Sequence, residues 1–164
     1  MLNIINKKSG LTLVELIITM AVFGILYGVV TVNLMGIKRQ ASLNSSLTTL
    51  ISDIKNQQLK AMSADTEGRS TNDSYGLYFA SDRYILFHGV TYNPSETSNF
   101  SVSLGDGMEF STINLPTNSI VFTKGSGEIS NFLIGSNTLT LTNTQNNEVK
   151  TITINQLGTI TTVN

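Results

Sequence analysis

The chain has 164 residues, of which 40% are apolar and only 13% charged, and its formal net charge is −1. The charged share is about half that of an average globular protein, and a chain so close to neutral offers no large electrostatic attraction to nucleic acid or anionic lipid. It contains no cysteine and one histidine, which excludes disulfides, thiolate catalysis and cysteine-based metal sites and gives no basis for an imidazole-rich metal site.

The first predicted element is an apolar helix. No charged residue occurs within residues 16–37, and a helical run of this length spans roughly the 30 Å hydrocarbon core of a bilayer. Lys7 and Lys8 precede the run, so the positive-inside rule places the N-terminus in the cytoplasm and the rest of the chain outside. Lys38 and Arg39 follow the run directly and weaken this bias.

Three interpretations of this segment compete. A cleaved secretory signal has an apolar region of about 7–15 residues and then a small-x-small cleavage site, whereas this run is longer and no Ala-x-Ala follows it. A plain signal anchor fits the length but leaves Glu15 unexplained, because a carboxylate within a spanning helix costs roughly 2.5–3.5 kcal/mol. The third interpretation accounts for Glu15.

The residues around Glu15 form a motif with fixed spacing. Residues 10–17 are GLTLVELI and residues 21–26 are AVFGIL. This pattern closely resembles the type IV prepilin signature of pilins and type II secretion pseudopilins, in which a short basic leader ends in glycine. The resemblance implies that a membrane aspartyl peptidase cleaves between Gly10 and Leu11 on the cytoplasmic side.

The same resemblance assigns roles to individual residues. Lys7 and Lys8 are the basic residues of the leader. Leu11, where the family more often has phenylalanine, becomes the new N-terminus and is N-methylated. Glu15 then stands fifth in the processed chain and serves as the assembly carboxylate.

This scheme explains why a carboxylate, Glu15, occurs at the start of an apolar helix. Cleavage creates an α-amino group on Leu11, which is positively charged below its pKa of about 8. A carboxylate that faces a neighbour's ammonium recovers much of the cost of lying in lipid, and the resemblance implies that this pairing operates between subunits as they leave the membrane for a filament.

Three glycines of this region also fit their positions. Gly10 has no Cβ, so its backbone can lie extended in a protease cleft. Gly24 and Gly28 have the GxxxG spacing that allows close helix packing.

The residues that follow predict an amphipathic continuation of the helix. Apolar residues recur there at three- and four-residue spacing, which is the stripe of a helix that buries one face: Leu43, Leu47, Leu50, Ile51, Ile54, Ala61 and Met62. We therefore predict one helix from about Leu11 to about Ser63, whose second half packs its stripe on a sheet. Gly68 marks a polar linker beyond the helix end.

From Tyr75 onward the pattern is that of β-strands. Segments rich in aromatic and β-branched residues alternate with turn residues, and Ser81-Asp82 is expected to turn the first hairpin. The predicted strands are Tyr75–Ala80, Arg83–His88, Phe100–Leu104, Met108–Ile113, Ile120–Thr123, Glu128–Ile134, Leu139–Thr142, Val149–Asn155 and Thr159–Val163.

This second half has a resemblance of its own. IVFTKG at 120–125, TLTL at 138–141 and ITINQLGTI at 152–160 resemble the closing pattern of the H-type minor pseudopilins, the GspH/FimT family, whose last hairpin turns at glycine. The resemblance implies an α+β, pilin-like fold: a long N-terminal helix, its first half transmembrane, packed on an antiparallel β-sheet or β-sandwich head. The expected divisions are a leader (1–10), a transmembrane and assembly half of the helix (11–37), an amphipathic half (38–66) and a β-rich head (67–164).

Other chemistry finds little support in the sequence. His88 ends an apolar strand without an acid or cysteine beside it, so we expect a packed or exposed histidine. Residues 105–109, GDGME, place two carboxylates near a turn but lack the alternating oxygen ligands of a calcium loop, so a tight turn is expected. No Gly-x-Ser-x-Gly elbow occurs, and residues 124–127 lack the spacing of a phosphate loop. We expect no enzyme activity, cofactor or metal.

The sequence thus predicts a structural minor pilin or pseudopilin of a type IV pilus or a type II secretion pseudopilus. It would be a single-pass protein of the bacterial inner membrane, with its head outside, that is later built into a filament. Its partners would be other pilin subunits, the prepilin peptidase and N-methyltransferase, and the assembly platform. The alternatives are a DNA-receptor minor pilin of a competence system and a membrane-anchored enzyme or ligand-binding β-domain. DNA binding is not expected, because residues 156–164 contain no Lys or Arg to contact phosphates.

Overall fold

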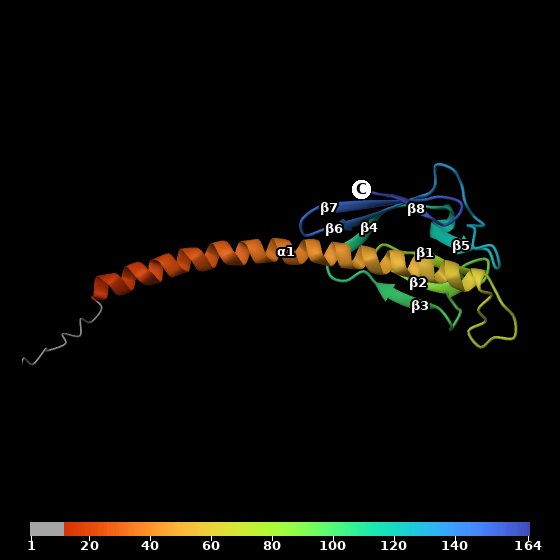
Figure 1. Ribbon diagram of the computed structural model, residues 1–164, viewed down its shortest axis with the longest axis horizontal. Coiled ribbons are helices and arrows are strands. Elements are labelled where there is room, and N and C mark those ends of the chain that lie inside the picture. Colours follow the sequence, from red (N-terminus) through yellow and green to blue (C-terminus); the bar gives the residue numbers. More distant parts are fainter. Residues whose placement is uncertain (1–11) are drawn as a thin grey trace, which may run out of the picture. The chain divides into compact units, whose positions relative to one another are not determined.

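The computed structural model describes residues 12–164, with only the backbone described for residues 29–42. This part of the chain forms one long helix, α1 (Leu13–Met62), a short 3₁₀ helix (Pro116–Asn118) and eight strands (Figure 1). The strands are β1 (Tyr75–Phe79), β2 (Arg83–His88), β3 (Phe100–Ser103), β4 (Met108–Asn114), β5 (Ser119–Phe122), β6 (Thr138–Asn143), β7 (Glu148–Ile154) and β8 (Ile160–Val163). The chain divides into an N-terminal unit that ends at Lys38 and a C-terminal unit, Arg39–Asn164. The predicted leader, residues 1–10, lies outside the described residues.

The helix α1 confirms the predicted helix of about Leu11 to about Ser63. Neither of the two prolines lies within it, so no backbone N–H of the helix interior is missing. The helix ends where Ala64 takes a left-handed conformation (φ 56°). The N–H of Asp65 then donates to the carbonyl of Lys60 at 3.1 Å, which is the closing bond of a Schellman motif.

The strands pair into two antiparallel sheets of four strands each. The order is β3-β2-β1-β5 in the first sheet and β4-β6-β7-β8 in the second. The predicted hairpin across Ser81 and Asp82 is confirmed, because β1 pairs with β2 in a register that sets Phe79 against Tyr84. The predicted last hairpin is confirmed as well, since β7 pairs with β8 across a turn that contains Gly158 (φ 73°).

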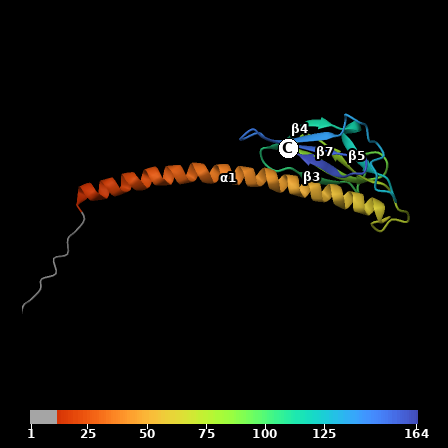
Figure 2. The same cartoon turned by 45° about the horizontal axis from the view of Figure 1, so that its top comes forward.

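One hydrophobic core joins the second half of α1 to both sheets. All strands lie on one side of this half of the helix (Figure 2). The helix buries most of the predicted stripe, and it does so against inward-facing residues of both sheets: Leu43, Leu47, Leu50, Ile54 and Ala61 from the helix, Leu77 and Phe79 from β1, and Leu139, Leu141 and Ile152 from β6 and β7. The predicted α+β architecture, a long helix on antiparallel sheets, is therefore confirmed.

One predicted strand, Glu128–Ile134, is wrong. This segment makes only isolated bridges, between Phe122 and Ile129 and between Leu133 and Ser136. The side chain of Asn131 occupies the place of a continuing ladder. Its amide nitrogen donates to the carbonyl of Ser119 at 2.8 Å, and its oxygen accepts from the N–H of Val121 at 3.2 Å. Asparagine competes with backbone pairing in this way, and apolar composition alone did not reveal it.

Candidate functional site

The start of α1 is closed by a reciprocal pair of side chains, Thr12 and Glu15. The backbone N–H of Glu15 donates to Thr12 Oγ1 at 3.3 Å, and the backbone N–H of Thr12 donates to Glu15 Oε2 at 3.0 Å. The Thr12 hydroxyl also donates to Glu15 Oε2, at 2.9 Å. This is a capping box, in which each residue satisfies an N–H that the first helical turn leaves without a partner.

The capping box places the motif carboxylate at the positive end of the helix dipole. A negative charge is favourable at this end, so the conformation of Glu15 is held by its own helix. Both bonds to the carboxylate use Oε2, and no residue of the described part donates to Oε1. This cap was not predicted, although Thr-x-x-Glu before an apolar run is its recognised pattern.

The other residues of the predicted motif lie outside the described residues: Lys7, Lys8, Gly10 and Leu11. The cleavage site and the methylated terminus therefore remain predictions. Thr12 is the first residue that the structure describes, and its backbone nitrogen lies 3.0 Å from the Glu15 carboxylate. The carboxylate is thus held one residue away from the predicted new N-terminus.

The first turns of α1 expose apolar side chains on every face. Phe23 is 72% exposed and Tyr27 is 73% exposed, and a Cβ added at Gly24 or Gly28 would meet no atom within 4 Å. Exposed apolar surface of this extent marks a region that a partner or a lipid phase covers.

A helix both long enough and apolar enough to span a membrane is not found among the residues that the structure describes. The predicted transmembrane segment, residues 11–37, includes Leu11 and side chains that lie outside that description.

The fold, a long N-terminal helix followed by an antiparallel β head, is consistent with the class of pilin-like proteins. Residues 5–31 match the family model described as the prokaryotic N-terminal methylation motif. This match includes every residue of the predicted prepilin motif and confirms the prediction of a type IV pilin-like protein. Neither the curated proteins nor the solved structures that were compared with the chain gave a match.

In the head, the fold gives His88 an acidic partner that is distant in the sequence and was not predicted. His88 Nδ1 lies 3.3 Å from Asp73 Oδ2. The β1–β2 register sets Tyr75 opposite His88, so the residues just before β1 lie beside the end of β2. Ser98 lines the same pocket as His88, but within the described residues no hydrogen bond joins the two, so the contact that a nucleophile and its base require is missing.

The segment GDGME, residues 105–109, is the tight turn that was predicted. The N–H of Met108 donates to the carbonyl of Gly105 at 3.3 Å, and Gly105 and Gly107 both have positive φ. Within residues 12–164, no group of three or more histidines and carboxylates is placed to hold a metal ion.

Proposed function

We propose that this chain is a structural minor pilin or pseudopilin of the H type, a subunit of a type IV pilus or a type II secretion pseudopilus. It is inserted in the bacterial inner membrane as a single-pass protein with its N-terminus in the cytoplasm and its head outside. Prepilin peptidase removes the leader at Gly10–Leu11 and Leu11 is N-methylated. The observation that carries the proposal is the N-terminal methylation motif at residues 5–31.

Two structural features support assembly through the N-terminal helix. The apolar residues of the first turns have no covering element within the described chain, so their surface is available to lipid and then to neighbouring helices. The chain also divides into two units after Lys38, close to the proposed boundary at residue 37 between the assembly half and the amphipathic half of the helix. The remaining proposed divisions are the leader (1–10), the amphipathic half (38–66) and the head (67–164).

The capping box sharpens the proposed role of Glu15. One carboxylate oxygen, Oε2, serves the first turn of its own helix. The other oxygen keeps its acceptor capacity, since an ionised carboxylate offers about four lone-pair sites. Glu15 can therefore cap its own helix and at the same time accept a hydrogen bond from the α-ammonium of a neighbouring subunit. The assembly platform would select subunits in which this pairing is made.

Processing tests the first half of the proposal. Gly10→Val places a branched side chain at the proposed cleavage site, and the full chain should keep its leader when expressed with a prepilin peptidase. Intact-mass measurement of the membrane fraction gives the result directly. Gly24→Val is the matched control, because that glycine has open space around it and lies outside the cleavage site. Normal removal of the leader from Gly10→Val would contradict the proposal.

Assembly into filaments tests the second half of the proposal, the pairing of Glu15 with a neighbouring subunit. Glu15→Ala should be inserted and processed normally but should be lost from sheared filaments. Because alanine removes both the cap and the intersubunit partner, Thr12→Ala is the control that weakens the cap alone. If Glu15→Ala enters filaments as well as the unchanged chain does, the proposed pairing is wrong. If Thr12→Ala is lost to the same degree as Glu15→Ala, the cap explains the defect and the pairing is again wrong.

A further inference from the structure

The two sheets have four outer edges within the described residues, and three of them are protected against pairing with another chain. β4 carries the charged Glu109 and a bulge between Phe110 and Thr112, and the register of the β7–β8 pair is interrupted as well. Asn131 and Ser130 bond to the backbone of β5 along its outer side. Bulges, charges and covering segments of this kind keep a free edge from acting as a template for a further strand.

The fourth edge, that of β3 (Phe100–Ser103), has none of these protections. Among the described strands β3 pairs only with β2, in a regular register, and it contains no charged residue or proline. The N–H of Leu104 donates to the carbonyl of Asp82, and the backbone bonds of an antiparallel pair alternate between residues. Ser101 and Ser103 therefore point their N–H and C=O groups away from β2, where a further strand can bond to them.

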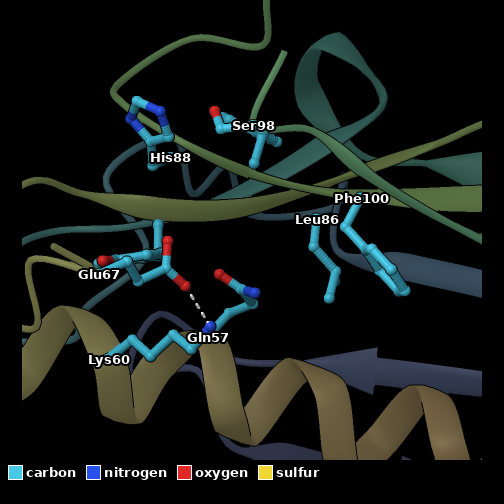
Figure 3. A pocket seen from close by; sticks show the side chains of 9 residues that line it. Gln57, Lys60, Glu67, Leu86, His88, Ser98 and Phe100 are labelled. Atoms are coloured by element: carbon cyan, nitrogen blue, oxygen red, sulfur yellow. Dashed lines mark hydrogen bonds and ion pairs between the residues drawn. The ribbon is translucent and has the colours of Figure 1, made fainter. Parts of the chain in front are cut away.

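Two pockets lie between this edge and the second half of α1. The larger has a volume of about 310 Å³, and its lining includes Gln57 of α1 and Phe100 of β3 (Figure 3). The smaller has a volume of about 100 Å³, and its lining includes Thr49 of α1 and Val102 of β3. Phe100 and Val102 are two residues apart and share one face of the strand. A strand added to β3 would place alternate side chains opposite them, one beside each pocket.

The larger pocket suits a large apolar side chain. Phe100 is 64% exposed although it lies beside the half-buried Leu86 of the paired strand, and Figure 3 shows the two side chains next to each other. An aromatic side chain directly opposite Phe100 on an added strand would cover the ring that the fold leaves open, and aromatic pairs of this kind stabilise sheets.

The smaller pocket suits a small side chain. Hydroxyl groups of Ser45, Ser46 and Thr49 from α1 line it on the helix side, and Ser46 already donates to the carbonyl of Leu104 at 2.9 Å. Its volume of about 100 Å³ has no room for a phenyl ring together with the strand that carries it. Alanine fits opposite Val102.

The charges beside this edge are paired with one another, so the edge is complementary to an uncharged segment. Lys60 and Glu67 line the larger pocket and form an ion pair. His88, on the same lining, faces Asp73. In the described part of the chain no charged side chain lines the smaller pocket. A charged side chain entering either pocket would lose hydration without gaining a partner of opposite charge.

The short length of β3 argues against a second copy of this chain as the occupant. Four residues extend roughly 13 Å, and two such strands edge to edge would bury far less than the roughly 1,200 Å² of a stable protein–protein interface. A single peptide strand is different, because it is held on one side by β3 and on the other by α1.

From these features we propose that the edge of β3 binds an extended, uncharged peptide segment of a partner protein. The segment adds an antiparallel strand to the first sheet, in keeping with the antiparallel pairing of that sheet. Its backbone bonds to Ser101 and Ser103. Two alternate side chains face the helix: a small one opposite Val102, and then a large apolar one opposite Phe100.

The binding test uses the full chain in lipid nanodiscs and a fluorescein-labelled peptide, Ser-Ala-Thr-Phe-Ser with blocked ends, followed by fluorescence anisotropy. In the proposed register the middle threonine lies opposite Ser101 and exchanges backbone bonds with it, whereas the N–H of the phenylalanine points away from β3. N-methylation of the threonine should weaken binding about tenfold, the effect of one lost hydrogen bond, and N-methylation of the phenylalanine should not. Equal binding of the two methylated peptides, or no binding of the parent peptide at millimolar concentration, would overturn the proposal.

A peptide of the same composition in the opposite order, Ser-Phe-Thr-Ala-Ser, tests the two pockets. Its phenyl group would lie opposite Val102, beside the smaller pocket, and it should bind about tenfold more weakly than the parent peptide. Equal binding of the two peptides would show that the pockets do not select side chains by size, and that part of the proposal would be wrong.

Two variants of the chain locate the site. Ser101→Pro removes the outward N–H, and proline is tolerated in an edge strand where its missing N–H faces solvent, so β3 should stay paired with β2. Peptide binding should fall about tenfold or more, whereas Ser101→Thr, the matched control, keeps the N–H and should bind as the unchanged chain does. Phe100→Ala removes the exposed ring and should also weaken binding, with Ile134→Ala as the control at an exposed apolar position.

Unchanged binding by Ser101→Pro would contradict the site, and if this variant fails to fold, unchanged binding by Phe100→Ala would contradict it. Sedimentation of the chain in detergent without peptide tests the other occupant. A dimer that Ser101→Pro converts to a monomer would assign the edge to a second copy and overturn the peptide assignment. None of these outcomes depends on leader processing or filament assembly, so this proposal and the proposed function fail separately.

Discussion

Tyr84 Oη donates a hydrogen bond of 2.6 Å to Asp53 Oδ2 and so ties β2 to the second half of α1. Tyr84 is 1% exposed. Burial, together with the Asp53 carboxylate that accepts its proton, raises the pKa of Tyr84 well above its ordinary value. Helix and sheet are thus joined by a polar contact inside an otherwise apolar contact region.

Removal of this hydroxyl should destabilise the head. Tyr84→Phe leaves the half-buried Asp53 carboxylate without its donor, and a hydrogen bond to a charged group contributes roughly 1.5–3 kcal/mol. Urea unfolding followed by circular dichroism should show a loss of this size in the free energy of unfolding. Tyr92→Phe, a loop tyrosine that stacks on Tyr78, should change it by less than about 0.5 kcal/mol. Equal stability of Tyr84→Phe and the unchanged chain would contradict the assigned contact.

The same pair predicts a dependence of stability on alkaline pH. Because the pKa of Tyr84 is higher in the folded than in the unfolded chain, the unfolded chain releases this proton first. The contribution of Tyr84 to stability is complete below its unfolded pKa of about 10 and declines as the pH rises above that value. Between about pH 9 and pH 11, Tyr84→Phe should therefore lose less stability than the unchanged chain does, as measured by urea unfolding at each pH.

Gln58 connects the helix to two loops of the head. Its amide nitrogen donates to the carbonyl of Gly127 at 2.9 Å and to the carbonyl of Leu157 at 2.7 Å. Gln58→Leu leaves both carbonyls without this donor, and we expect a loss of roughly 1–3 kcal/mol in the free energy of unfolding. Asn56→Leu, at an exposed position of the same helix, is the control and should lie within about 0.5 kcal/mol of the unchanged chain.

Gly76 allows β1 to pack closely against its neighbours. A Cβ at this position would lie 2.6 Å from Cζ of Phe87 and 2.7 Å from the carbonyl oxygen of Ile120. The phenyl ring can move, but the carbonyl belongs to the paired strand β5 and cannot. Gly76→Ala should therefore destabilise the head by about 1–3 kcal/mol, whereas Gly24→Ala, with open space around it, should not destabilise it. Thermal unfolding would show the difference.

The Thr12 cap should control fraying at the start of α1. Thr12→Val removes the hydroxyl that accepts from Glu15 N–H, and loss of such a cap costs about 1 kcal/mol. Amide hydrogen exchange of residues 13–16 in lipid nanodiscs should become about five- to tenfold faster. Thr12→Ser keeps an acceptor and should stay close to the unchanged rate. Equal exchange in the valine and serine variants would show that the hydroxyl does not cap the helix.

Most of the architecture could be predicted from the residues, because it depends on local patterns. The three- and four-residue spacing of Leu43, Leu47 and Leu50 identified the buried face of the helix, and alternation with threonine identified β6 and β7. The strand expected at Glu128–Ile134 failed for a physical reason: the Asn131 side chain bonds to β5 in place of the backbone.

The sequence by itself determined the prepilin motif, the long helix and the β-rich head, since spacing, hydropathy and turn residues act between neighbours in the chain. Only the tertiary structure decided which distant polar groups meet. Asp53 and Tyr84 are 31 residues apart, and the pairing of Asp73 with His88 follows from the β1–β2 register. The pocket around Gln57 likewise exists only where α1 passes the edge of the sheet, because burial of an amide depends on what the fold packs over it.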